Sequence, residues 1–271
     1  MLGSTPSFTN PPIVELVLGV EFTPIDALKS IHYQGIYDLF RDIFPISQDA
    51  QPLATSVENV EGDPHTQIAF QVDTNPTLPR LWCLSREKDL LIQFQADRFV
   101  LNWRKRGEQD VYPTFEELAP KFEHEFFRLK NHVRDEFEVE LNVSQIEVSY
   151  VNLVSSKDFS KLYKFQKIIN DKNIDLEGLS ASFVEVLGFD DYAHNARLIY
   201  DVQVALKQAD SPRDHRLSLT VRGAPKQQSH ENIEVFMQAA HDKIVSKFLS
   251  ITTLSAQRKW GKTQILIPQC R

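Results

Sequence analysis

The residues that stand out for their chemistry lie near the end of one predicted strand: Asn102, Trp103, Arg104 and Arg106. An indole beside two guanidinium groups can stack on and clamp a planar anion or an acidic peptide, because arginine presents a flat, permanently charged fork. We expect these residues, together with Arg222 at the end of a similar predicted strand, to form a binding surface.

Two interpretations of this segment stay open. Period-two alternation over residues 99–104 places Trp103 and Arg104 on opposite faces of the strand. In the alternative interpretation, Trp103 belongs to the hydrophobic core. The arginines then lie in solvent at the strand end and pair with Glu108 or Asp110, which contributes little to stability.

A second group of basic residues steps by three or four positions along one predicted helix face: Lys157, Lys161, Lys164 and Lys167. Basic residues interleaved with aromatic ones can follow a single strand of nucleic acid, and Tyr163 lies among these lysines. The alternative is an ordinary solvated helix face. The chain carries 30 Lys and Arg against 37 Asp and Glu, a net charge of −7, which argues against extensive nucleic-acid wrapping.

The motifs of several enzyme classes are incomplete in this sequence. Gly261-Lys262-Thr263 lacks the upstream glycine of a phosphate-binding loop, and no two glycines are separated by a single residue. His124 and Glu125 begin a His-Glu-x-x-His pattern, but Arg128 occupies the place of the second metal ligand. The sequence contains no Gly-x-Ser-x-Gly or Cys-x-x-Cys motif. We therefore expect no catalytic residues, no cofactor and no metal site.

Length and composition indicate an ordinary globular protein. The chain has 271 residues, of which 42% are hydrophobic and 25% charged, and this length suits one large domain or two small ones. Two cysteines, Cys83 and Cys270, are too few for a disulfide framework and favour a reducing compartment. The start of the sequence has no signal-peptide pattern, and no apolar run approaches the ~20 residues of a membrane span. The expected location is the cytoplasm, with no membrane partner.

Apolar residues that recur every three or four positions predict two long helices, Thr114–Phe137 and Glu231–Leu254. Thr114 and Glu117 predict a capping box at the start of the first helix, because each side chain can bond the other residue's backbone N–H. Pro120 predicts a kink or a restart of that helix. Two shorter helical patterns cover Pro24–Phe44 and Asp158–Ile169.

Alternation with a period of two predicts a series of strands between these helices, separated by turn-rich segments. The predicted strands are Ile13–Phe22, Ile68–Val72, Arg80–Leu84, Leu90–Gln95, Phe99–Arg104, Ile146–Val154, Phe183–Leu187, Leu198–Leu206 and Arg216–Arg222.

The two halves of the chain present their elements in the same order: a strand, a helix, several antiparallel strands and a long helix. This order predicts an α+β fold made of two similar halves, residues 1–140 and 141–271. Each half would be a curved antiparallel sheet packed by a long C-terminal helix, as in helix-grip folds. Strands pairing between the halves would merge them into one domain.

Several segments together resemble an uncharacterised, sporadically distributed family of prokaryotic proteins of about this length, known by a family number alone. The segments are Pro11–Phe22, Gln93–Phe99, Asn102-Trp103-Arg104 and Tyr112-Pro113 with the helix that follows. The resemblance spans essentially the whole chain, although its specific motifs lie in the first half. The family has no established catalytic residues or cofactor, so the resemblance implies none here. Its patchy distribution is typical of mobile defence or toxin–antitoxin loci.

These observations favour a non-catalytic binding module with another protein as its partner. Such a module would be an antitoxin-like or sensor subunit of a multi-gene prokaryotic system. Two alternatives stay open: an enzyme of unrecognised type with an interior acid–base pocket, and a nucleic-acid sensor that uses the lysine stripe.

Overall fold

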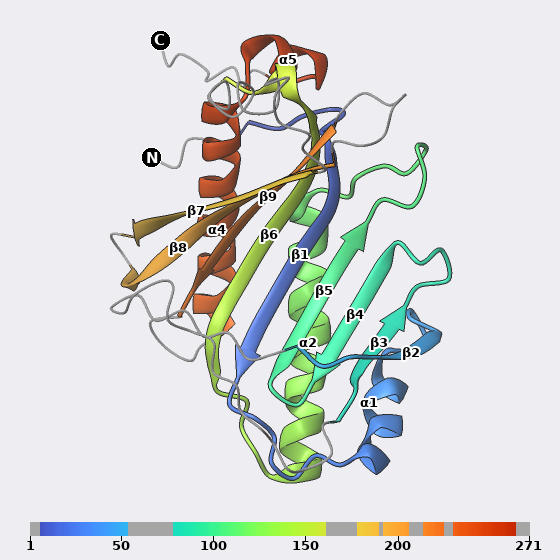
Figure 1. The fold of residues 1–271 in the computed structure, drawn as a ribbon. Helices are drawn as coiled ribbons and strands as arrows, with labels where there is room; N and C mark the ends of the chain where they lie inside the picture. Colours follow the sequence, from blue (N-terminus) through green and yellow to red (C-terminus); the bar gives the residue numbers. More distant parts are fainter. Residues whose placement is uncertain are drawn as a thin grey trace, which may run out of the picture.

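Nine strands of the described chain form one antiparallel sheet, in the order β2-β3-β4-β5-β1-β6-β9-β8-β7 (Figure 1). The computed structural model describes residues 6–53, 78–160, 178–189, 192–205, 214–224 and 230–263. The strands are β1 Ile13–Phe22, β2 Ile46–Ala50, β3 Arg80–Leu84, β4 Leu90–Gln95, β5 Arg98–Arg104, β6 Val143–Ser155, β7 Gly178–Phe189, β8 Tyr192–Ala205 and β9 Asp214–Gly223.

The long helices pack on one face of this sheet. Helix α2 contacts β5 and α4, while α4 also contacts β6 and β9, and α1 contacts β3 and α2. Figure 1 shows α2 and α4 together behind the strands. None of the described helices covers the opposite side of the sheet, which we call the helix-free face. The helical elements are η1 Ser30–His32, α1 Tyr33–Phe40, α2 Phe115–Phe137, η2 Ser156–Asp158, α4 His230–Ile251 and α5 Leu254–Lys259.

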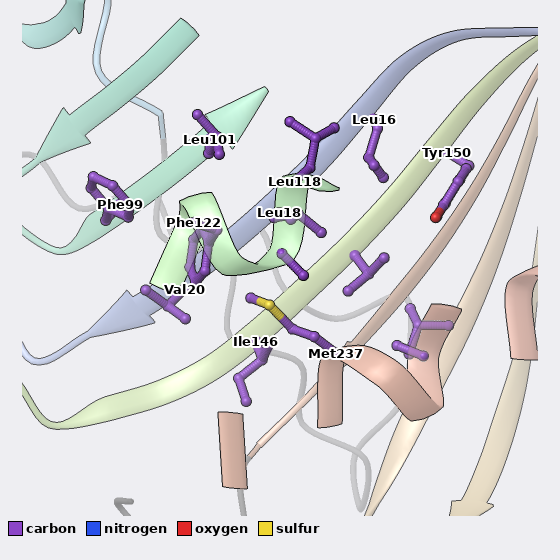
Figure 2. Packing of buried hydrophobic residues seen from close by; sticks show 14 of the residues in the cluster. Leu16, Leu18, Val20, Phe99, Leu101, Leu118, Phe122, Ile146, Tyr150 and Met237 are labelled. Carbon is purple, nitrogen blue, oxygen red and sulfur yellow. The ribbon is translucent and has the colours of Figure 1, made fainter. Parts of the chain in front are cut away.

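The hydrophobic core lies between the sheet and these helices. Alternate residues of each central strand point into it, because successive side chains of a strand face opposite sides. The ring centroid of Phe99 in β5 lies 5.5 Å from that of Phe122 and 5.7 Å from that of Phe126, both on α2. Figure 2 shows core residues from both halves of the chain side by side: Leu16, Leu18, Val20, Phe99, Leu101, Leu118, Phe122, Ile146, Tyr150 and Met237.

The strands of the two predicted halves form a single merged sheet. The two predicted halves do not form separate sheets, because β1 and β6 pair antiparallel along most of their length and join all the strands into one. The predicted α+β class with antiparallel strands is confirmed. The predicted strand Ile68–Val72 lies outside the described residues, as does the predicted helix Asp158–Ile169 beyond Ser160.

Other local predictions were wrong. The helix expected over Pro24–Phe44 is limited to η1 and α1. Thr114 is the residue before α2, but its side chain makes no capping hydrogen bond, so the capping box does not form. Helix α2 runs through Pro120 as one helix, so the predicted restart there does not occur.

No helix within the described ranges has the length and apolar character needed to cross a membrane.

Candidate binding face

The helix-free face is defined by the side chains of β5 that point away from the helices. Phe99, Leu101 and Trp103 are buried in the core. Successive side chains of a strand alternate between its two faces. Asn102 and Arg104, which come directly after Leu101 and Trp103, therefore project to the helix-free face.

The structure places Trp103 in the hydrophobic core, as in the alternative interpretation. Its side chain is only 2% exposed, and its ring meets that of Tyr112 edge-to-face at 5.4 Å between centroids. Trp103 shares the strand face of the core residues Phe99 and Leu101, so it cannot lie beside Arg104 on the surface.

The aromatic residue that meets the arginines is Trp82 on β3. The guanidinium carbon of Arg80 lies 5.4 Å from the Trp82 ring centroid, and that of Arg104 lies 5.6 Å from it. Both distances fall within the range of a cation–π interaction. The alternation of Arg80–Leu84 contained this signal, because Leu81 and Cys83 are core residues and Trp82 lies between them.

Three donors of this cluster have no acceptor. The Nε atoms of Arg80 and Arg104 and the Nε1 atom of Trp82 are buried and make no hydrogen bond within the part of the chain that the structure describes. A buried donor without an acceptor costs about 1–3 kcal/mol of stability. A bound group that brings acceptor atoms would recover that cost.

Asn102 belongs to a hydrogen-bonded row that joins residues of β4, β5, β1 and β9 and passes over β6. Gln93 Nε2 donates to Asn102 Oδ1 at 2.6 Å, and Asn102 Nδ2 donates to Glu15 Oε1 at 3.0 Å. Arg216 on β9 donates to the other oxygen of Glu15 at 3.2 Å. Asn102 is 4% exposed, so it holds the side chains of Gln93 and Glu15 in place and offers little surface to a partner.

Two arginine–glutamate pairs face each other across the centre of the sheet. Arg98 pairs with Glu21 between β5 and β1 at 2.5 Å, and Arg222 pairs with Glu147 between β9 and β6 at 2.6 Å. They surround a hollow of about 140 Å³ above Gly19, which has no side chain to fill it. We call this space the central hollow.

Glu21 is the most perturbed group of the central hollow. Burial raises the pKa of its carboxyl group, and the guanidinium groups of Arg98 and Arg222 act in the opposite direction. Its Oε2 atom is buried and has no hydrogen-bond donor among the described residues. A carboxylate in this position favours a ligand that brings a donor.

The strands of the helix-free face carry more positive than negative side chains. Among the side chains that the structure describes, six arginines project from β3, β5, β8 and β9, whereas four carboxylates project from β1, β6 and β8. This positive balance contrasts with the net charge of −7 of the whole chain. The arginines are Arg80, Arg98, Arg104, Arg197, Arg216 and Arg222, and the carboxylates are Glu15, Glu21, Glu147 and Asp201.

Two of the remaining candidate residues, Arg106 and Lys157, lie outside the strands of this face. Arg106 is exposed in the loop after β5, where its backbone N–H donates to Asp110 Oδ2 at 2.6 Å. The backbone N–H groups of Arg106 and Gly107 lower the pKa of the Asp110 carboxyl group. Lys157 is exposed in η2, while Lys161, Lys164 and Lys167 lie outside the described residues.

The His-Glu fragment on α2 has a structural role. Glu125 is 1% exposed and pairs with Arg128 at 2.8 Å and with His124 at 3.1 Å. Arg128 also donates to the Leu39 carbonyl, which links α2 to α1.

The described residues contain no group of three or more His, Cys, Asp or Glu side chains arranged to hold a metal ion. Burial raises the pKa of the Cys83 thiol to about 12, so this cysteine is unreactive at neutral pH.

Comparisons with known proteins give little further guidance. No protein-family model and no curated protein matches the chain. Among solved structures, the chain is similar to the rolling circle replication initiator protein from Geobacillus stearothermophilus. The match has 13% sequence identity and a TM-score of 0.29, and it covers 94% of this chain and 92% of that chain. A likeness of this size carries no conclusion about fold or function.

Proposed function

We propose that the protein is a non-catalytic binding module whose helix-free face holds an acidic segment of a partner protein. The observation that carries this proposal is Trp82 with Arg80 and Arg104 over its ring, and three buried donors without acceptors in the described chain. Carboxylates supply acceptors and negative charge together, and arginine binds them with two parallel hydrogen bonds.

The rest of the face supports an extended acidic ligand. Arg216 is 48% exposed and Arg222 is 26% exposed, so both retain surface for a partner although each pairs with a glutamate. The row Gln93–Asn102–Glu15–Arg216 fixes side chains in place across the sheet. Fixed side chains lose less conformational entropy on binding, which favours affinity.

A protein partner is favoured over nucleic acid. Nucleic-acid surfaces gain affinity from a continuous positive field. Here Glu15, Glu21 and Glu147 alternate with the arginines of the central strands. Such an alternation selects a partner with charges of matching spacing.

We further propose that the two halves arose by duplication. From the centre of the sheet outward, the order is β1-β5-β4-β3-β2 on one side and β6-β9-β8-β7 on the other, so the two sides correspond except for the additional edge strand β2. The ion pairs follow the same relation, because Glu21 of β1 pairs with Arg98 of β5 as Glu147 of β6 pairs with Arg222 of β9. By this relation the counterpart of Arg222 is Arg98 rather than Arg104.

The resemblance to the sporadically distributed family extends the proposal to a cellular role. In this proposal the protein acts as an antitoxin-like or sensor subunit of a multi-gene prokaryotic system. The acidic segment would then belong to a protein encoded by a neighbouring gene.

The test is purification of the tagged protein from its native host, with the neighbouring genes intact and with or without nuclease. We expect a stoichiometric protein companion that survives nuclease and dissociates as salt rises, because its contacts are ionic. The variant Arg80→Ala/Arg104→Ala should lose this companion. The matched control is Arg41→Ala/Arg134→Ala, which removes two arginines, 58% and 50% exposed, from the helix side.

Three results would contradict the proposal. They are the absence of any companion, retention of the companion by Arg80→Ala/Arg104→Ala, and equal loss in both double variants. Co-purified nucleic acid that nuclease removes would instead support the nucleic-acid sensor.

A further inference from the structure

A second cavity lies on the helix side, away from the helix-free face. Its volume is about 440 Å³, within the range of about 300–1,000 Å³ that small-molecule sites occupy. Residues of the segment before β1, the loop after β5, the start of α2, β6 and α4 line it. We call it the aromatic cavity.

Aromatic rings form much of its wall. The Phe115 ring stacks on the imidazole of His241 with 4.4 Å between centroids and an angle of 12° between planes. Tyr150 meets the other side of this cluster, with its ring 5.7 Å from that of His241. Phe8, Trp103 and Tyr112 also line the cavity. Flat, rigid walls of this kind favour a flat ligand.

A chain of hydrogen bonds fixes the polar groups at the wall. The hydroxyl group of Tyr150 bonds Nδ1 of His241 at 2.6 Å, and the hydroxyl of Tyr112 donates to that of Tyr150 at 3.5 Å. His241 is 8% exposed and Tyr150 is 4% exposed. Their positions are therefore set by the fold before any ligand arrives.

Carboxylates at the wall favour positive charge inside the aromatic cavity. Glu116 lines the cavity, and after burial it contributes to the raised pKa of both Tyr112 and Tyr150. Burial lowers the pKa of His241, while Glu116 and Asp242 oppose that shift. Glu116 thus acts in the same direction on three groups: it raises the pKa of Tyr112 and of Tyr150, and it opposes the lowering of the pKa of His241 by burial. Glu117 also contributes at Tyr112.

The cavity wall carries more acidic than basic residues, which also favours a positively charged ligand. Glu108, Asp110 and Glu116 line the aromatic cavity, against Lys105. The positive end of the α2 dipole would favour an anion, but Glu116 and Glu117 occupy its first turn and oppose that preference. Burial lowers the pKa of His241, which keeps the ring uncharged near neutral pH and removes a source of repulsion for a cation.

We propose that the aromatic cavity binds a flat aromatic ligand that carries a positively charged amine. The rings around Phe115 and His241 take the aromatic plane, and the electron-rich faces of the rings together with Glu116 take the charge. This site is separate from the helix-free face and does not depend on the function proposed for that face.

The test uses three indole probes of similar size that differ in charge: tryptamine (cationic), tryptophol (neutral) and indole-3-acetate (anionic). Binding to the full chain is measured by isothermal titration calorimetry at pH 7. We expect tryptamine to bind with one-to-one stoichiometry and more tightly than the other two. The NMR signals of the His241 ring should shift on binding, because an indole ring would lie close to it.

Variants locate the bound charge. Glu116→Gln should weaken tryptamine binding by roughly fivefold and leave tryptophol unchanged, since it removes charge from an exposed side chain without altering the walls. Glu117→Gln is the matched control, because Glu117 is exposed in the same turn and is not part of the cavity wall. We expect it to change tryptamine binding less than twofold. Val245→Trp should fill the cavity and abolish binding.

The proposal is overturned if tryptamine shows no saturable binding or if indole-3-acetate binds as tightly as tryptamine. It is also overturned if Glu117→Gln weakens binding as much as Glu116→Gln, because the effect would then come from general surface charge. Glu116 is exposed, so its variant reports on the site even if Val245→Trp fails to fold.

Discussion

Separate replacement of Trp82 and Trp103 by alanine tests which face of the sheet each side chain occupies. Trp103 is 2% exposed in the core, whereas Trp82 is partly exposed on the helix-free face and meets two arginines. Replacement of a buried Phe or Trp by Ala typically costs about 3–5 kcal/mol. We therefore expect Trp103→Ala to lower the free energy of unfolding by about this amount.

Trp82→Ala should cost much less. It removes two cation–π contacts, each worth about 0.5–1 kcal/mol at a partly exposed site, so we expect a loss of about 1–2 kcal/mol. Because Trp82 belongs to the proposed binding face, this variant should nevertheless lose the protein companion. Trp103→Leu, which keeps most of the buried volume, should retain that companion.

The free energies are measured by urea unfolding followed by far-ultraviolet circular dichroism, which does not depend on tryptophan fluorescence. Companion binding is measured on each purified variant at the same concentration. Equal losses of stability for Trp82→Ala and Trp103→Ala, or a larger loss for Trp82→Ala, would refute the assignment of the two faces. Retention of the companion by Trp82→Ala would refute the role of Trp82 in recognition.

Two further predictions concern the second half of the chain. Gly223→Ala should destabilise the protein by about 1–3 kcal/mol in the same urea assay. A Cβ atom at this position would lie 2.9 Å from Phe236 Cζ and 3.0 Å from Ala196 Cβ, which is too close for unstrained packing. An unchanged unfolding midpoint would show that the core around Gly223 has room for a methyl group. Burial lowers the pKa of His241, so the unfolded chain binds a proton first as the pH falls below about 6.5, and the folded state loses stability over that interval. Thermal unfolding between pH 7.5 and 5 should therefore show a steeper loss for the wild type than for His241→Gln, and parallel curves would count against this effect.

Much of the fold followed from periodicity. The bounds of β3 and β4 agree with the predicted strands Arg80–Leu84 and Leu90–Gln95, because each is a short alternating run closed by charged turn residues. Helix α4 likewise follows its apolar stripe. In these segments the local pattern and the tertiary environment favour the same structure.

Strand β2 was missed because its sequence, Ile-Ser-Gln-Asp-Ala, has only one strongly apolar residue. It forms at the edge of the sheet by pairing with β3, which is a tertiary contact that no local pattern encodes.

The candidate site was predicted only in part. Alternation correctly separated Trp103 from Arg104, but it does not say which of two opposite strand faces the helices will cover. That choice depends on where α2 packs, and the rings of Phe122 and Phe126 on α2 meet Phe99 on the same face as Trp103. The aromatic cavity could not be predicted either, because Tyr150 and His241 come from distant parts of the chain and meet only in the folded protein.

The central position of β1 has a consequence for how the chain reaches its native state. Leu16 of β1 lies opposite Trp103 of β5 on one side and opposite Tyr150 of β6 on the other. Pairings between residues so distant in sequence close large loops and slow folding. During synthesis, one edge of β1 remains unpaired until the ribosome has made β6, and an open edge of this kind is prone to pair with other chains. The first half therefore exposes an open edge on β1 until the second half covers it, which favours folding of the two as one cooperative unit.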